Sequence, residues 1–185
     1  MSVELVPGAV GLGLLERLYR QRESFHIGAE AMRDVALAVD RLDAAVAGGA
    51  PIYGVNTGFG KLASVRIGEG DLAALQRNIV LSHSAGFGKP LPADVVRLVI
   101  ALKCISLGRG ASAVRPVVIE RLQHLAASDV IPVVPEKGSV GASGDLAPLA
   151  HVAAVLIGEG EAFHKGERMP AARALQAVGI APLEL

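Results

Sequence analysis

The 185-residue chain has little cysteine, few aromatic residues and no excess of charge of either sign. Its only cysteine, Cys104, excludes an internal disulfide and fits a reducing compartment. Cys104 lies in an apolar helical run, so we expect it in the core. Lys plus Arg and Asp plus Glu number 18 each, so no net field draws the protein to nucleic acid or to an anionic membrane.

Long hydrophobic runs are missing as well. The longest apolar stretch, residues 146–157, is interrupted only by His151 and is too short to cross a bilayer, so we expect a buried helix there. The N-terminus lacks a basic start followed by an apolar block, which predicts that there is no signal peptide. We therefore expect a cytoplasmic protein that acts on a small molecule and has neither a membrane nor a nucleic-acid partner.

Several common site motifs are absent. The segment around Gly144 ends in Gly-Asp, whereas a phosphate loop ends in Gly-Lys-Ser/Thr, and Asp145 stands where the serine-hydrolase elbow needs glycine. A serine hydrolase is thus the weakest alternative. The histidines outside the motifs described below show no metal-ligand spacing, so we expect no metal and interpret them as structural or surface residues: His26, His124, His151 and His164.

What the chain does contain is aliphatic residues at helical spacing. Hydrophobic residues reach 51%, which predicts helices buried nearly all round and contacts between subunits. The expected elements, within one mainly α domain over residues 1–185, are helices over 32–47, 71–86 (with Asp71 as N-cap), 92–107 (the central helix), 116–127 and 146–157 (capped by Asp145), a hairpin over 163–168 turned at Lys165-Gly166, and a short helix over 170–178.

Residues 138–149 have the composition of a segment that can make its own reactive group. In a tight turn, the Gly144 amide nitrogen can attack the Ala142 carbonyl carbon, because glycine has no Cβ to block the approach. Loss of one water from the ring, and of the Ser143 hydroxyl as a second water, leaves an exocyclic methylene on a five-membered imidazolone. That product is an electrophile, which enzymes otherwise take from a cofactor. For this composition, a flexible glycine-rich loop is the alternative.

Two further features stand upstream. Residues 51–63 hold three glycines and Tyr53, one of two tyrosines in the chain, so we expect a loop. Ser82-His83 stands near the end of an expected helix. Taken alone, Tyr53 could be a packing residue, and His83 could be a partner of a helix C-terminus or a surface residue.

Together, residues 137–149 and 51–63 resemble the two signature segments of the aromatic amino acid ammonia-lyases, and the resemblance extends from about residue 30 to the end. It implies that Ala142, Ser143 and Gly144 form 4-methylidene-imidazol-5-one (MIO), with no metal or external cofactor, and that Tyr53 is the catalytic base. It also implies the N-terminal segment of the L-aspartase/fumarase-like helical fold, with glycine-rich active-site loops. Members of the family are homotetramers whose active sites are shared between subunits.

Ser82-His83 matches the pair that distinguishes substrates in this family, and histidine-type members carry Ser-His. The resemblance therefore implies that Ser82 and His83 bind L-histidine, from which ammonia is eliminated to give trans-urocanate in the first step of histidine degradation. Family members are more than twice this length, so the chain resembles a truncated member, without the later residues that include the carboxylate-binding arginine. The alternatives are a tyrosine or phenylalanine lyase or aminomutase that also uses MIO, and a catalytically incomplete helical interaction module.

Overall fold

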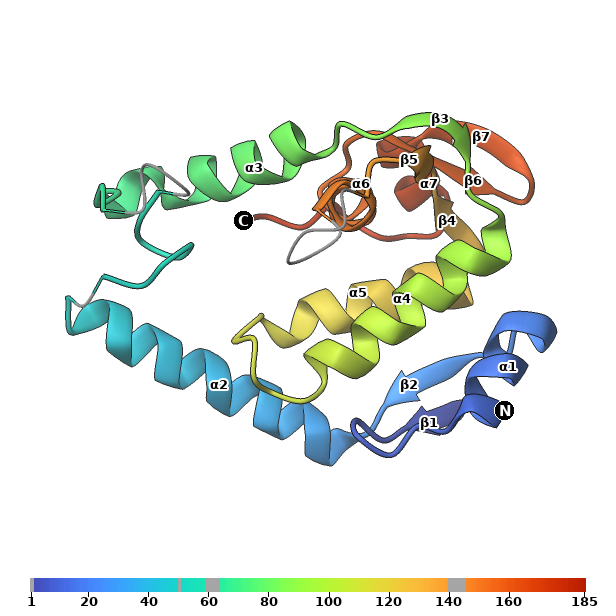
Figure 1. Ribbon diagram of the computed structural model, residues 1–185, viewed down its shortest axis with the longest axis horizontal. Helices are drawn as coiled ribbons and strands as arrows, with labels where there is room; N and C mark the ends of the chain where they lie inside the picture. The colour runs from blue at the N-terminus through green and yellow to red at the C-terminus, as the bar shows by residue number, and fades with distance from the viewer. Residues whose placement is uncertain (1, 50, 59–63, 140–145) are drawn as a thin grey trace.

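The computed structural model describes residues 2–49, 51–58, 64–139 and 146–185. As the sequence predicts, the architecture is mainly α, with short strands at its edges (Figure 1). In chain order the elements are β1 (Val3–Leu5), α1 (Leu12–Gln21), β2 (Phe25–Ile27), α2 (Ala29–Ala47), a 3-10 turn (Glu69–Asp71), α3 (Leu72–His83), β3 (Phe87–Pro90), α4 (Ala93–Leu107), α5 (Pro116–Ala127), β4 (Val130–Pro132), β5 (Pro135–Lys137), α6 (Leu146–Leu156), β6 (Glu161–His164), β7 (Glu167–Pro170) and α7 (Ala171–Ala177).

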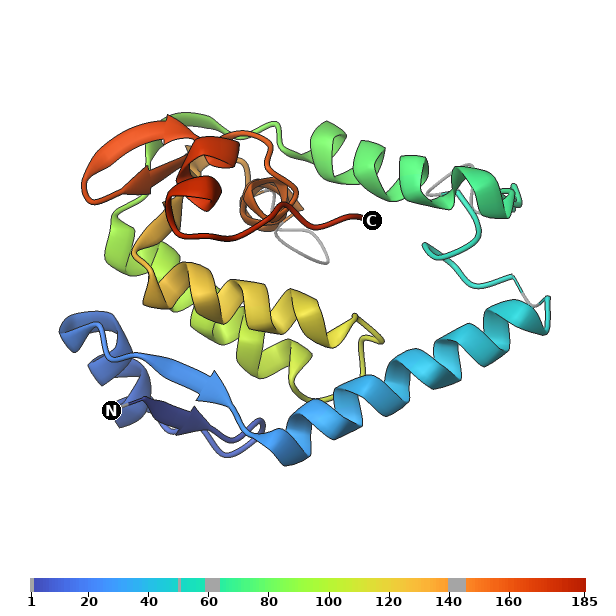
Figure 2. The same cartoon turned by 180° about the vertical axis from the view of Figure 1, so that it is seen from behind.

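The core lies between α4 and α5, which run side by side through the centre of the molecule (Figures 1 and 2). Ile100 and Cys104 of α4 and Ile119 of α5 are fully buried there. The predicted core position of Cys104 is therefore confirmed, and burial raises the pKa of its thiol to about 12. Arg97 of α4 donates to the Ala126 carbonyl at 2.6 Å, which ties α4 to the last turn of α5.

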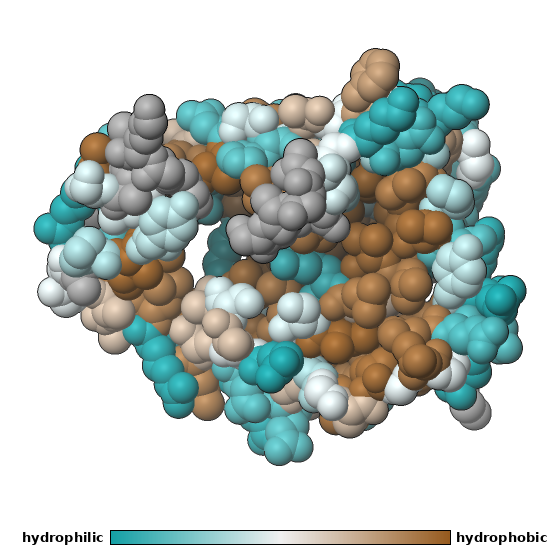
Figure 3. Space-filling model, viewed as in Figure 1, coloured by the Kyte–Doolittle hydropathy of each residue, from teal (hydrophilic) through white to brown (hydrophobic). Residues whose placement is uncertain are grey.

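α4 packs against α1, α5, β2 and β4, so the predicted central position is confirmed. One of its apolar residues, Leu102, remains 44% exposed. Hydrophobic residues gather over α4 on the face seen in Figure 3.

The N-terminal region forms a small unit that the sequence analysis does not anticipate. β1 and β2 pair in parallel and α1 is the connection between them, packed against α4. The Ile27 backbone N–H donates to the Gln123 side chain of α5, which fastens β2 to the core.

Two helices form an arm around the central pair. α2 and α3 extend away from the body, and the segment that contains Tyr53 joins them at the outer end of the arm (Figures 1 and 2). Of α2 only Val35 is buried, and no described residue of α3 is. The arm therefore depends on few internal contacts, of which the packing of α3 against α6 is the most extensive.

The C-terminal end carries the three-stranded sheet β4-β6-β7 and α7. β6 and β7 form the predicted hairpin, and its turn uses positive φ at both Lys165 (52°) and Gly166 (81°), as a two-residue hairpin turn requires. Elsewhere β3 pairs antiparallel with β5, joining residues about fifty positions apart in the sequence.

Most helix predictions are confirmed by α2, α4, α5, α6 and α7. The expected end near Gly86 of the helix over 71–86 is wrong, since α3 ends at His83. The Gly86 N–H donates to the His151 ring instead of to a helical carbonyl, and the chain continues directly into β3. Asp71 is the N-cap as expected, although its side chain makes no capping hydrogen bond. No helix of the described ranges is both long and apolar enough to span a membrane.

Candidate active site

The segment around Tyr53 is a turn closed by the side chain of Asn56. The Asn56 Oδ1 accepts the Ile52 backbone N–H at 2.7 Å, and the Asn56 N–H donates to the Ile52 carbonyl at 3.2 Å. Asn56 is only 5% exposed. Gly54 has a φ of 75°, a conformation that favours glycine. The motif residues Gly54 and Asn56 therefore fix the backbone on which Tyr53 stands.

This turn is anchored to α3. The Gln76 Nε2 donates to the Gly54 carbonyl at 3.2 Å, one residue from Tyr53. Tyr53 itself is 64% exposed, so its ring lies at the surface of the arm. The hydrogen bond makes α3 the element that sets the position of the tyrosine.

The Ser82-His83 pair is the end of the same helix. The His83 Nδ1 lies 2.8 Å from the Ile79 carbonyl, so it carries the proton that is donated there. The Ser82 Oγ lies 3.2 Å from the same nitrogen. In a neutral ring with its proton on Nδ1, the Nε2 is an acceptor, which makes His83 suited to bind an N–H or O–H of a ligand.

The chain after His83 meets both ends of the glycine-rich segment. β3 pairs with β5 immediately before this segment, with Phe87 opposite Lys137. A Cβ on Gly138 would lie 3.2 Å from the Gly86 Cα and 2.9 Å from the Ala147 Cβ, so the three residues leave no room for a methyl group. Residues 138 and 147, which flank the predicted ring-forming residues, are thus held together against Gly86.

His151 of α6 completes this contact. Its Nε2 accepts the Gly86 N–H at 3.0 Å, and burial lowers the pKa of its ring below the ordinary value. The sequence analysis treats His151 as structural or surface, and the one sequence signal that singles it out is its place as the only polar residue in the apolar run 146–157. In the structure, His151 lies against Gly86, three residues after His83.

α3 therefore joins two of the predicted site features. From Gln76 to His83 the helix rises about 10 Å, at about 1.5 Å per residue. It holds Tyr53 near one end and His83 at the other, and its C-terminal extension reaches Gly138 and Ala147. The predicted ring-forming residues Ala142, Ser143 and Gly144 lie outside the described residues, as does the predicted helix cap Asp145.

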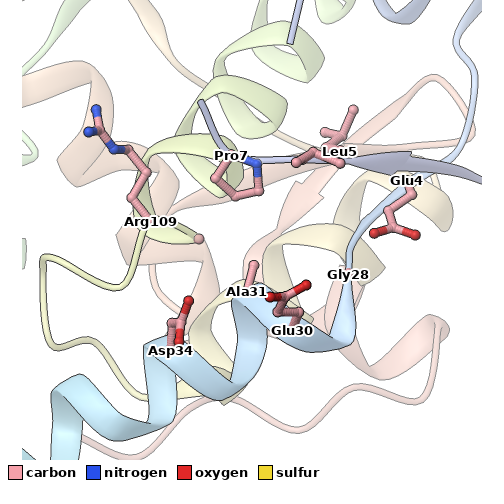
Figure 4. A pocket seen from close by; sticks show the side chains of 10 residues that line it. Glu4, Leu5, Pro7, Gly28, Glu30, Ala31, Asp34 and Arg109 are labelled. Atoms are coloured by element: carbon pink, nitrogen blue, oxygen red, sulfur yellow. The ribbon is translucent and has the colours of Figure 1, made fainter. Parts of the chain in front are cut away.

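A different pocket, of about 400 Å³, lies at the N-terminus of α2 (Figure 4). Glu4, Glu30 and Asp34 line it, and Arg109 extends away from these carboxylates (Figure 4). The Glu4 carboxylate lies over Gly28, the N-cap of α2, where negative charge is favourable. None of Tyr53, Ser82 and His83 lines this pocket. Within the described ranges no three His, Cys, Asp or Glu residues are arranged to hold a metal ion.

Comparison with known proteins bears on these features. Residues 11–185 match the profile of a family described as aromatic amino acid lyase, so the match includes α1, upstream of the expected start near residue 30. The chain is similar to tyrosine aminomutase from Streptomyces globisporus, with 34% identity and a TM-score of 0.91. It is also similar to phenylalanine aminomutase from Pantoea agglomerans (31%, 0.94) and histidine ammonia-lyase from Trypanosoma cruzi (30%, 0.90). Each comparison covers 100% of this chain but only 35%, 36% and 35% of the respective solved chain.

Proposed function

The chain belongs to the aromatic amino acid lyase family, and from this premise we propose that it is the N-terminal part of a histidine ammonia-lyase. The reaction is the elimination of ammonia from L-histidine to give trans-urocanate. The activity is proposed for the whole protein, since this chain covers only 35% of the solved tyrosine aminomutase and of the solved histidine ammonia-lyase. By analogy with the family, we also propose a cytoplasmic homotetramer.

The observation that carries the substrate assignment is the hydrogen bonding of His83. Because Nδ1 donates to the Ile79 carbonyl, Nε2 is left as an acceptor at the end of α3. The imidazole of L-histidine has a ring N–H that can donate to it, whereas the phenyl ring of phenylalanine has no donor. A histidine substrate therefore pairs with this nitrogen, and phenylalanine leaves it without a donor.

A second candidate is a tyrosine lyase or aminomutase. A phenol O–H can donate to the same Nε2, and the similarity to tyrosine aminomutase from Streptomyces globisporus, at 34% identity, favours it. The pair Ser82-His83 favours histidine, because the resemblance to the family implies that histidine-type members carry Ser-His at this place.

The residues around the glycine-rich segment fit an MIO group formed from Ala142, Ser143 and Gly144. The contact of Gly138, Gly86 and Ala147, too close for a Cβ, brings the two ends of the segment together as ring closure requires. α6 begins directly after the segment, so its N-terminus presents partial positive charge toward it. When formed, MIO supplies an electrophile that makes the substrate amine a better leaving group.

The remaining chemistry belongs to side chains. The Tyr53 Oη is the proposed base for the β proton of the substrate, a role that needs the phenolate. The His83 Nε2 orients the substrate ring, and the Gln76 side chain holds the turn that carries Tyr53. No residue of this chain is assigned here to hold the substrate carboxylate.

The test uses the complete protein. Intact mass should show the loss of two waters at residues 142–144, and the enzyme should form urocanate from L-histidine more efficiently than it converts L-tyrosine or L-phenylalanine. His83→Leu should lower kcat/KM for histidine by roughly 5- to 150-fold, since an unpaired buried polar group costs about 1–3 kcal/mol. His124→Leu, on the exposed side of α5, is the matched control. Preference of the wild type for tyrosine would support the second candidate instead.

A further inference from the structure

The contact between Gly86 and His151 connects the substrate-binding end of α3 to the segment that carries the predicted MIO residues. Gly86 is three residues after His83, and its N–H donates to the His151 Nε2 at 3.0 Å. A Cβ on Gly86 would lie 2.9 Å from that nitrogen and 3.1 Å from Pro135, so the backbone is enclosed from both sides. The imidazole thus fixes the path of the chain between α3 and β3.

His151 also belongs to the helix that carries Ala147, shortly after the segment 140–145. On α6, His151 follows Ala147 by one turn, so both residues lie on the face of the helix that packs against α3. Ala147 meets Gly138, and Gly138 meets Gly86. A displacement of Gly86 from His151 would therefore disturb the contact that Gly138 and Ala147, on the two sides of residues 140–145, make beside Gly86.

We propose that His151 is a positioning residue that, by accepting the Gly86 N–H, holds the chain after His83 against both ends of the segment 140–145. Ring closure needs Ala142 and Gly144 pressed together, so it depends on this hydrogen bond. The inference rests on the proposed function, because it concerns formation of the ring by this chain.

The protonation state of His151 decides whether the bond exists. A neutral ring with its proton on Nδ1 accepts at Nε2, and an imidazolium cannot accept. Burial lowers the pKa of His151, so the ring stays neutral in the folded protein near neutral pH. Its contribution is complete above the ordinary histidine pKa and is lost as the pH falls through the lower, folded value.

Other charged groups lie near His151, and their titration has to be distinguished from that of its ring. A cavity of about 390 Å³ beside His151 is lined by Glu161 and Arg168, which form an ion pair with each other. On the side of α3, Arg77 pairs with Glu159. Further titratable or charged groups are His83 of α3 and Glu136 and Lys137 of β5. The other helices packed against α6 carry Glu120, Arg121 and His124 (α5) and Arg173 (α7).

The experiment compares His151→Gln with His151→Leu in the complete protein. A glutamine carbonyl can accept near the Nε2 position and does not titrate, whereas leucine has no acceptor. The readouts are the ring content of the folded, soluble fraction, by intact mass, and the rate of ring formation after refolding, by near-ultraviolet absorbance. We expect His151→Leu to form the ring at least about tenfold more slowly and His151→Gln to restore most of the rate. His124→Leu is the control.

A merely structural role would lower the folded fraction but not the ring content of the folded molecules. Ring formation within twofold of the wild type in folded His151→Leu would overturn the proposal. If His151→Leu does not fold, the pH dependence of the rate of ring formation tests the proposal instead. The wild-type rate should fall on the acid side and that of His151→Gln should not, and a shared acid limb would refute the role of His151. Absence of the ring from wild-type protein would contradict the proposed function instead.

Discussion

The residues of the tyrosine turn have separable tasks. Gly54 provides the positive φ of 75°, and Asn56 closes the turn through its side chain and backbone. Tyr53 takes no part in that closure and is 64% exposed.

Replacing Tyr53 by phenylalanine tests its role as the base. Loss of the hydroxyl removes proton transfer, which is worth about 10²–10⁴-fold in rate, and should lower kcat by a factor in that range. Ring formation, by intact mass, and the melting temperature should stay at wild-type values. A raised KM with unchanged kcat would make Tyr53 a substrate-binding residue instead.

The site residues that belong to sequence motifs can be predicted from the sequence, whereas the residues that hold them in place cannot. Tyr53, Ser82 and His83 are found through resemblance to a family and stay predictions, because their roles depend on chemistry that the fold does not test. Gln76 and His151 act through single hydrogen bonds to backbone atoms of Gly54 and Gly86. Such contacts join residues 22 and 65 positions apart and leave no local pattern.

Among the elements, α3 has the largest part in arranging the site. It is 12 residues long, has no buried described residue, and is anchored by Gln76 to the tyrosine turn and by packing to α6. α3 therefore links the segment of Tyr53 to His83, with the hydrogen bond of Gln76 as one of the contacts that hold this segment.

The substitution Gln76→Met tests this arrangement. Methionine keeps the length of the side chain and removes the donor to the Gly54 carbonyl, a loss of about 1 kcal/mol. We expect kcat of the complete enzyme to fall about fivefold and ring content to stay unchanged. Gln176→Met, at an exposed position of α7, is the matched control. Equal kcat values for the two variants would show that Gln76 does not position the tyrosine.

The helices could be predicted and the strands mostly could not. Apolar spacing sets α2, α4 and α5, and the Lys165-Gly166 turn sets the β6–β7 hairpin. β3, β4 and β5 have three or four residues each, too few to show a period of two, and β3 and β5 exist only because they pair with each other. Glycines at positions 8, 11 and 13 surround the first turn of α1 and obscure its start.

At the scale of the whole molecule, apolar surface exceeds what the chain buries. Hydrophobic residues gather over α4 (Figure 3), and large apolar side chains are exposed on several elements. The exposed positions include Leu37, Leu81, Phe87, Leu102 and Leu146. Contiguous apolar surface of this kind favours association with further protein.

We expect the 185-residue chain expressed alone to be inactive as a lyase. It spans 35% of the histidine ammonia-lyase from Trypanosoma cruzi, and its apolar faces should drive association or aggregation. The measurements are urocanate formation from L-histidine and intact mass at residues 142–144, with the complete protein as control. Saturable turnover by the 185-residue chain would show that it contains a complete site.

The buried thiol between α4 and α5 makes it possible to measure how often the core opens. Cys104 is the only cysteine of the chain, is fully buried, and has a pKa of about 12, so almost none of it is thiolate near neutral pH. An alkylating reagent can therefore modify the folded protein only during the moments when the two helices separate. The rate at which Cys104 is alkylated therefore reports how often α4 and α5 separate at this position. The measurement needs neither the absorbance of the ring nor catalytic turnover.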